Sequence, residues 1–196
     1  MIPRSAQIAG AVILIALFAA AIYGLQLKRR DERNKQQAAP APLSAESANQ
    51  TKFPALIAFD EDGVLVQREL SAALPQESSA RVRMMLRTLL HQYMQNPSPH
   101  PVPAGSDIGA VYLTADGLCV VDLNATLADQ HRSGMLIEQF TVMSLLETIH
   151  LNAPQVQRVK LLVDGKERAS LAGHADLASV YDAAAVHAAV QEYQHR

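Results

Sequence analysis

The sequence has no tryptophan, one cysteine and few aromatic residues, and each shortage excludes a class of protein. The chain has a single cysteine, Cys119, so it cannot form an internal disulfide framework. A chain without disulfides can lie on either side of a membrane. Aromatic residues make up 5% of the chain, so stacking platforms for bases are not expected. The net charge of −2, without a basic face in the folded part, excludes an electrostatic footprint for nucleic acid. At 196 residues, we expect one compact domain with an aliphatic core, plus appendages.

Residues 8–27 form an uncharged apolar stretch near the N-terminus. As a helix they would be about 30 Å long, which matches the hydrocarbon thickness of a bilayer. A water-soluble helix would need a polar face, and this stretch has none. We therefore predict a transmembrane helix at 8–27, preceded by a flank at 1–7, with the lipid bilayer as its partner. The alternative is a cleaved signal peptide with an Ala19-x-Ala21 site, although the apolar run continues past that site.

Residues 28–52 are predicted to be a basic flank followed by a flexible linker. Five basic residues follow the apolar stretch: Lys28, Arg29, Arg30, Arg33 and Lys35. Alanine, proline, serine and glutamine then dominate without apolar periodicity, which is typical of a tether. Taken alone, the positive-inside rule would place the rest of the chain in the cytoplasm.

Residues 53–178 are predicted to form the folded domain, in which apolar strands run into Asp-Gly turns. Three hairpins are expected, at 53–59 with 64–70, 108–114 with 118–123, and 156–163 with 167–171. Helices are expected at 80–95 and 134–151, where apolar residues recur at three- and four-residue spacing. Those residues are Val82, Met85, Leu86, Leu89 and Tyr93, and then Leu136, Phe140, Met143, Leu146 and Ile149.

The resulting ββαββαββ order predicts an α+β fold. We expect a two-layer α/β sandwich, with a mixed sheet and the helices on one face. Residues 179–196 are predicted to be a helical tail, which either packs on the domain or offers a partner a docking helix.

The sequence carries no recognisable catalytic, metal or cofactor motif. HExxH, GxSxG, the phosphate loop and GxGxxG are all absent, and the seven histidines form no tight cluster. Cys119 lies between apolar residues of a strand and is expected in the core. Glu138 is expected to pair with Arg132 or a backbone amide, without a catalytic role. The alternative is a membrane-bound hydrolase or metal-dependent enzyme that uses Cys119 and His174.

From residue 53 to about 177 the chain resembles the GerMN domain, the sporulation and spore-germination domain. The likeness is carried by Pro103-Ala104-Gly105-Ser106, the run DGLCVVDLN at 116–124, Glu138 and Thr148, LVDG at 162–165, and Gly173-His174. The residues that we call the signature residues, and expect to be structural, are Asp116, Gly117, Asp122, Leu123, Glu138, Thr148, Val163, Asp164, Gly165, Gly173 and His174.

The resemblance implies a non-enzymatic module of a bacterial cell-envelope protein, on the outer side of the cytoplasmic membrane. It implies no catalytic residue, metal or cofactor. We therefore expect a single-pass, membrane-tethered domain that binds an envelope protein or peptidoglycan, or a second copy of itself. The basic flank favours an alternative function, that of a membrane adaptor that faces the cytoplasm. The name of the domain does not define the physiological process.

Overall fold

The computed structural model describes residues 50–194. Its elements, in chain order, are β1 (Thr51–Phe59), β2 (Val64–Ala72), α2 (Ser78–Tyr93), β3 (Ile108–Leu113), β4 (Leu118–Leu123), α3 (Ala125–Asp129), α4 (Met135–Asn152), β5 (Arg158–Val163), β6 (Val180–Asp182) and α5 (Ala183–Gln194). The transmembrane helix predicted at 8–27, and nearly all of the predicted linker, lie outside the described residues. Within residues 50–194, no helix is both long and apolar enough to cross a bilayer.

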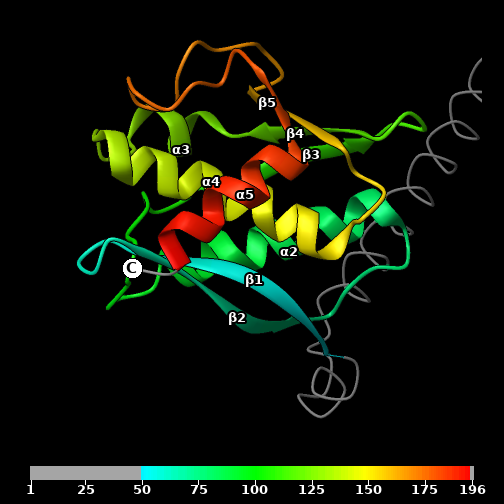
Figure 1. Cartoon of the computed structure of the whole chain (residues 1–196), viewed down its shortest axis with the longest axis horizontal. Helices are drawn as coiled ribbons and strands as arrows, with labels where there is room; N and C mark the ends of the chain where they lie inside the picture. Colours follow the sequence, from blue (N-terminus) through cyan, green and yellow to red (C-terminus); the bar gives the residue numbers. More distant parts are fainter. Residues whose placement is uncertain (1–49, 195–196) are drawn as a thin grey trace, which may run out of the picture. The chain divides into compact units, whose positions relative to one another are not determined.

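The strands form two sheets, and the prediction of a single sheet is wrong. Strands β1 and β2 pair only with each other, while the second sheet has the order β3-β4-β5-β6. In that sheet β3–β4 and β5–β6 are antiparallel and β4–β5 is parallel, which confirms a mixed sheet. Helices α2, α4 and α5 lie between the four-stranded sheet and the β1-β2 hairpin (Figure 1). The fold is therefore a mixed α+β fold with three layers, not the predicted two.

The third predicted hairpin forms its Asp-Gly turn but not its return strand. Asp164 and Gly165 have φ values of 48° and 72°, and Val163 and Lys166 exchange both backbone hydrogen bonds across the turn. Positive φ at both central positions defines the type I′ hairpin turn. The strand expected at 167–171 is absent. The edge of β5 that faces away from β4 pairs with β6 instead, from Arg158 to Lys160. The chain after Lys166 instead follows a loop to residue 179, anchored by the buried Leu171 and Leu177.

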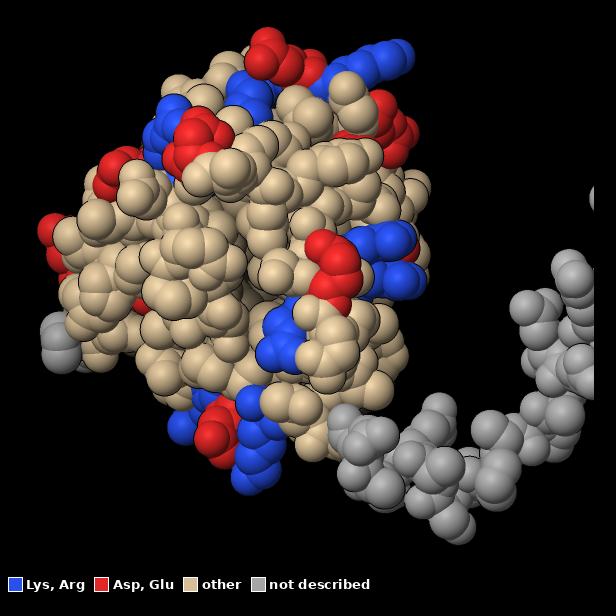
Figure 2. Space-filling view, turned by 90° about the vertical axis from the view of Figure 1, so that its right-hand side faces the viewer, with Lys and Arg blue, Asp and Glu red and all other residues tan. Residues whose placement is uncertain are grey.

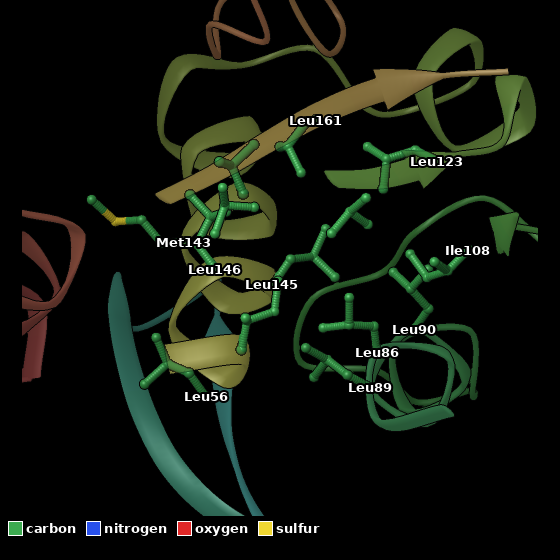
Figure 3. Packing of buried hydrophobic residues seen from close by; sticks show 14 of the residues in the cluster. Leu56, Leu86, Leu89, Leu90, Ile108, Leu123, Met143, Leu145, Leu146 and Leu161 are labelled. Atoms are coloured by element: carbon green, nitrogen blue, oxygen red, sulfur yellow. The ribbon is translucent and has the colours of Figure 1, made fainter. Parts of the chain in front are cut away.

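Helix α4 is buried on almost every side, because it lies between the two sheets. Four residues of its predicted stripe are buried, but Leu136 is 41% exposed, which corrects that part of the prediction. Thr141, Ser144, Leu145 and Thr148, off the stripe, are also buried. Figure 3 shows leucines of α4 between Leu56 of β1 and Leu161 of β5. A helix that is buried in this way must pair its polar side chains with hydrogen-bonding groups of the protein.

Two further segments differ from the sequence prediction. The polar stretch at 124–133 contains the short helix α3, which Asn124 caps by accepting the Leu127 N–H. Helix α2 begins after Glu77, whose carboxylate accepts the N–H groups of Ser79 and Ala80, so it starts at Ser78 and not at the expected residue 80. All five residues of the predicted α2 stripe are buried.

The C-terminal segment belongs to the body of the domain. Strand β6 extends the four-stranded sheet, and α5 packs on α4 and β2, so packing on the domain is the alternative that the structure shows. On the face in Figure 2, charged side chains of both signs adjoin one another around a broad area with neither charge.

Candidate functional site

Five signature residues meet where the parallel strands β4 and β5 end. Asp122 Oδ1 accepts the Gly165 N–H at 2.7 Å, and the Asp164 N–H donates to the Leu123 carbonyl at 2.9 Å. Leu123 and Val163 are register partners in the parallel pair. The carboxyl ends of parallel strands often bind ligands, but here the two motifs bind each other. Asp164 is occupied too, since its Oδ1 accepts the Ala125 N–H that begins α3.

The Asp116-Gly117 turn is pinned to the start of β5. Asp116 forms a 2.7 Å ion pair with Arg158, and the Gly117 carbonyl accepts two backbone N–H groups, from Gln157 and Arg158. Gly117 has φ of +80°, and a Cβ there would lie 3.1 Å from the Gln155 carbonyl oxygen. Glycine is therefore required by both the backbone conformation and the close approach.

Glu138, near the start of α4, holds the loop that carries Gly173 and His174. Its Oε2 accepts the N–H groups of Ala172, His174 and Ala175 at 2.8–3.0 Å. Its Oε1 accepts His174 Nδ1 at 2.8 Å and the Gly134 N–H at 3.1 Å. Burial alone would raise the pKa of Glu138, but the His174 and backbone hydrogen bonds outweigh it and hold the pKa below its usual range. The carboxylate pairs with backbone amides, as one of the two sequence alternatives predicted, and it stays ionised.

Side chains of α4 and α2, among them Thr148, form hydrogen bonds with backbone groups of β1. Its hydroxyl accepts the Leu56 N–H at 3.1 Å, and the Tyr93 hydroxyl accepts the Ala58 N–H at 2.9 Å. The Asn152 side chain donates to the Pro54 carbonyl at 2.7 Å. The backbone groups that β1 turns away from β2 are thus paired with helix side chains, which explains how a two-stranded sheet is held.

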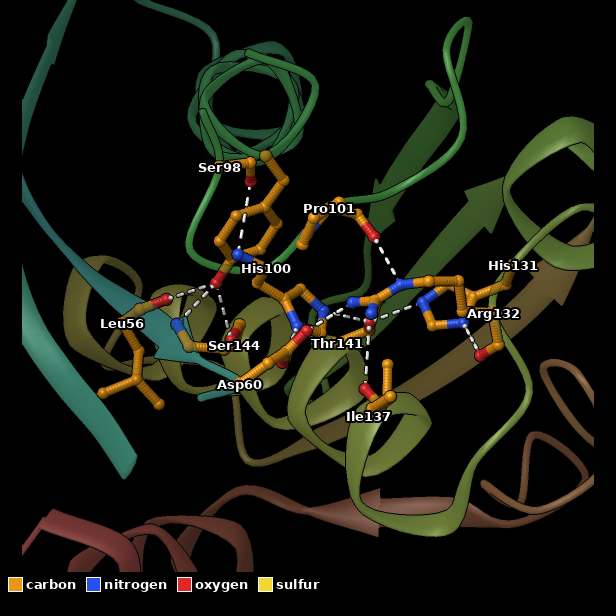
Figure 4. Close-up of polar contacts among 12 residues, drawn as sticks. Leu56, Asp60, Ser98, His100, Pro101, His131, Arg132, Ile137, Thr141 and Ser144 are labelled. Atoms are coloured by element: carbon orange, nitrogen blue, oxygen red, sulfur yellow. Dashed lines mark hydrogen bonds and ion pairs between the residues drawn. The ribbon is translucent and has the colours of Figure 1, made fainter. Parts of the chain in front are cut away.

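A buried polar cluster, which the sequence did not indicate, joins four segments around Thr141 of α4 (Figure 4). His100 Nδ1 lies 2.5 Å from Asp60 Oδ1, and His100 Nε2 lies 2.6 Å from Thr141 Oγ1. His131 Nε2 lies 2.7 Å from the same hydroxyl, and its Nδ1 lies 2.8 Å from the Arg132 carbonyl. Arg132 closes the cluster by an ion pair with Asp60. We call these five residues the Thr141 cluster.

The hydrogen bonds of His131 assign the tautomer of this ring. A carbonyl only accepts, so His131 Nδ1 carries a hydrogen, and burial lowers the pKa of His131, which favours the neutral ring. His131 Nε2 is then an acceptor for the Thr141 hydroxyl at 2.7 Å, and the Ile137 carbonyl is a second, more distant acceptor at 3.3 Å.

The Thr141 cluster has the connectivity of an acid, a base and a hydroxyl, but not the accessibility of a catalytic triad. His100 and Thr141 have no exposed surface, and the Thr141 hydroxyl lies within hydrogen-bond distance of both histidine rings and the Ile137 carbonyl. A nucleophile must reach its substrate. A cleft of about 430 Å³ opens beside Asp60 and Arg132, between the β1-β2 turn and the proline-rich 97–101 loop, and it does not expose Thr141. The cluster is best explained as a clamp that fixes these loops on α4.

The residues of the enzyme alternative are not brought together. Cys119 is fully buried in β4, and burial raises its pKa to about 12, so the thiol is protonated. His174 donates to Glu138, and within residues 50–194 no hydrogen bond joins it to Cys119. In the same part of the chain, no three His, Cys, Asp or Glu side chains have the spacing of a metal site.

One cluster on α4 and α5 is incompletely paired. Glu147 Oε1 accepts His187 Nδ1 at 2.7 Å, and the rings of His150 and His187 lie 5.0 Å apart. Glu147 Oε2 and His150 Nδ1 are buried and lack a hydrogen-bond partner among the described residues. Such groups cost stability, so this cluster weakens the α4–α5 contact relative to full pairing.

An accessible concave surface with a mostly apolar lining is a groove of about 460 Å³ between α4, α5, β6 and the loop before β6. Its volume is in the range of ligand sites. It is lined by Met135, Gln139, Val142, Met143, Leu146, His174, Ala175, Asp176, Val180, Tyr181, Asp182, Ala185, Val186 and Ala189. Met135 and Val180, two of the large apolar side chains of this lining, are 71% and 51% exposed. We call it the α4–α5 groove.

Of the signature residues, only His174 lines this groove. The others lie in turns, strand ends and the α4 clamps. The groove was missed because α5 reads as an alanine-rich helix with a weak stripe. The available signal was that its small side chains, Ala185 and Ala189, leave space beside larger residues of α4.

The fold and its clusters define a small α+β domain whose buried polar side chains hydrogen-bond mainly within the domain and whose α4–α5 groove has a mostly apolar lining. A family model described as Germane: Sporulation and spore germination matches residues 53–169, more than half of the chain. The chain belongs to this family, which confirms the resemblance to GerMN domains. The match ends before Gly173-His174, β6 and α5.

Three solved structures are similar to the chain. The first GerMN domain of the Bacillus subtilis sporulation protein GerM is 19% identical with a TM-score of 0.45, over 66% of this chain and 94% of that one. The tandem GerMN domains of GerM give 19% and 0.48, over 66% of this chain and 45% of theirs. A candidate lipoprotein from Clostridium perfringens gives 18% and 0.42, over 68% and 86%. No curated protein matches the chain.

Proposed function

We propose that this protein is a membrane-tethered, non-enzymatic module of the bacterial cell envelope, which binds a protein partner on the outer side of the cytoplasmic membrane. The observation that carries the proposal is a contrast between a buried polar interior and an accessible groove. Glu138, His100 and Thr141 are buried and hydrogen-bonded within the domain, whereas the lining of the accessible α4–α5 groove is mostly apolar.

The tether and the location rest on the sequence and the family. Residues 8–27 are uncharged and long enough to span a bilayer, and the flexible composition of 28–52 would let the domain turn beside it. Membership in the sporulation and spore germination family favours an extracytoplasmic domain over a cytoplasmic adaptor. A domain of this length is translocated largely regardless of the nearby basic residues.

Two measurements on the full chain test the proposal. Alkaline phosphatase fused after the last residue should be active, since this enzyme matures outside the cytoplasm, whereas an active cytoplasmic reporter would contradict the location. Crosslinking in native membranes should recover an envelope protein, and recovery of only peptidoglycan or only the chain itself would contradict a protein partner.

The enzyme alternative has its own test. The variant Cys119→Ser should retain the crosslinked partner and the phenotype of the wild type. A loss of phenotype with retained folding and retained partner would favour the enzyme.

A further inference from the structure

We propose that the α4–α5 groove binds a protein segment in which apolar side chains are followed or preceded closely by lysine or arginine. This inference rests on the proposed function and names the chemistry of the partner. It is carried by the composition of the groove floor and by the charge of its rim.

The floor of the groove is apolar and adaptable. Val142, Met143 and Leu146 of α4 form one wall, and Val186 of α5 lies opposite. Met135 at the mouth is a flexible side chain with most of its surface exposed. Methionines suit surfaces that take apolar side chains of varied shape, and buried apolar anchors supply most of the binding energy at such sites.

The rim of the groove is acidic. The acidic residues that line it are Asp176 and Asp182, and none of the lysines and arginines within residues 50–194 lines it. Asp176 is exposed, and hydrogen bonds from the Ser179 side chain and the Ala178 N–H lower its pKa, so it is a carboxylate at neutral pH. Lys160, whose charge reaches Asp176, is 8% exposed and donates to the Ala178 carbonyl. His174 and Tyr181 are the other titratable lining residues: the His174 ring faces the Glu138 carboxylate, and burial raises the pKa of Tyr181 to about 12.

Both carboxylates have one oxygen in use and can be neutralised without loss of local structure. Asp176 Oδ1 accepts the Ala178 N–H, and Asp182 Oδ1 accepts the Ala185 N–H at the start of α5. Asparagine can accept the same hydrogen bonds, and it is a good N-cap residue. Asp176→Asn and Asp182→Asn therefore remove the rim charge alone. A partner with basic residues at these positions would lose about fivefold in affinity for each charge removed, the upper range for an exposed pair.

Two adjacent alanines of α5 allow a test variant of the groove floor and a matched control variant. Ala184 and Ala185 are both exposed and adjacent, but only Ala185 lines the groove. Leucine is a good helix former at either position. Ala185→Leu should partly fill the groove and reduce binding about tenfold, whereas Ala184→Leu should leave binding unchanged.

The experiment uses the full chain in native membranes with p-benzoylphenylalanine in place of Met135 or Val180, or of Tyr112 as a reference. Tyr112 is 61% exposed on β3, outside the groove. After irradiation, mass spectrometry identifies the captured segment. We expect capture from Met135 and Val180 of a protein segment with apolar residues beside lysine or arginine. Capture should fall in the Asn variants and in Ala185→Leu, with circular dichroism confirming that each variant is folded.

The other outcomes separate the two proposals. Capture of an acidic or uncharged segment, of a lipid or of a second copy of the chain overturns the inference, as does capture that is insensitive to these variants. If Tyr112 captures an envelope protein while the groove positions capture nothing, the inference fails and the proposed function stands. If no position captures a protein, both fail.

Discussion

Replacement of Glu138 by glutamine tests whether this carboxylate is a structural clamp. The two oxygens accept five hydrogen bonds, three from backbone N–H groups of the 172–175 loop, one from Gly134 and one from the His174 ring. Glutamine keeps one acceptor oxygen and turns its NH₂ group toward at least two of these donors. At about 1–3 kcal/mol for each donor left without an acceptor, the change costs about 2–6 kcal/mol. That is a large share of the ~5–15 kcal/mol stability of a typical domain.

The assay is urea unfolding followed by far-UV circular dichroism, because the sequence has no tryptophan to report on unfolding. Glu167→Gln is the control, since the Glu167 side chain is 79% exposed and its loss should change stability little. Equal stabilities of Glu138→Gln and Glu167→Gln at pH 7 would refute the clamp.

The pH dependence provides a second, independent check on Glu138. Its pKa is lower in the folded protein than the ordinary value of 4.5, so the unfolded chain binds the proton more readily. The stabilisation by this carboxylate is therefore fully present above about pH 4.5 and is lost as the pH falls toward the folded pKa. Between pH 4.5 and pH 3 the wild type should lose about 2 kcal/mol relative to Glu138→Gln, at about 1.4 kcal/mol per pH unit. A stability difference that stays constant from pH 7 to pH 3 would contradict the assignment.

Three further predictions concern other buried groups. Thr148→Val should cost about 1–3 kcal/mol and speed amide exchange at the β1 N–H that Thr148 accepts, whereas Thr88→Val should not affect this amide, because Thr88 only donates to a carbonyl of its own helix. Cys119 should resist iodoacetamide at pH 8 until urea unfolds the protein, and rapid labelling of the native state would contradict its burial. Ring ¹⁵N shifts at pH 7 should show His131 protonated at Nδ1 and not at Nε2, and the opposite tautomer would overturn this assignment.

The features that the sequence predicted well are those that depend on patterns of residues close together in the chain. The α2 stripe from Val82 to Tyr93, the first two Asp-Gly hairpins and the buried place of Cys119 each depend on residues close along the chain. The separation of the β1-β2 hairpin into its own sheet could not be read this way. It depends on contacts such as that between Leu56 and Thr148, which are 92 residues apart.

The prediction of the return strand in the third hairpin was wrong for a related reason. The Asp164-Gly165 turn is local and formed as predicted, but the return strand had to compete for the edge of β5 with β6, a three-residue segment that carries little strand signal of its own. The Thr141 cluster was missed because its histidines come from two different loops, and neither loop has a motif that points to the other.

The polar residues of α4 share one physical task. Glu138, Thr141 and Thr148 lie along a helix that is buried between two sheets, and each binds a different neighbour: the 172–175 loop, the two histidine loops and the edge of β1. Residues used in this way cannot also bind a substrate without releasing the segments that they hold. The α4–α5 groove is different, because its alanines and methionines hold no loop in place, and its rim carboxylates can give up their charge without losing their hydrogen bonds. Substitutions along the buried face of α4 should therefore change stability first, whereas Ala185→Leu and the rim variants should change binding in a protein of unaltered stability.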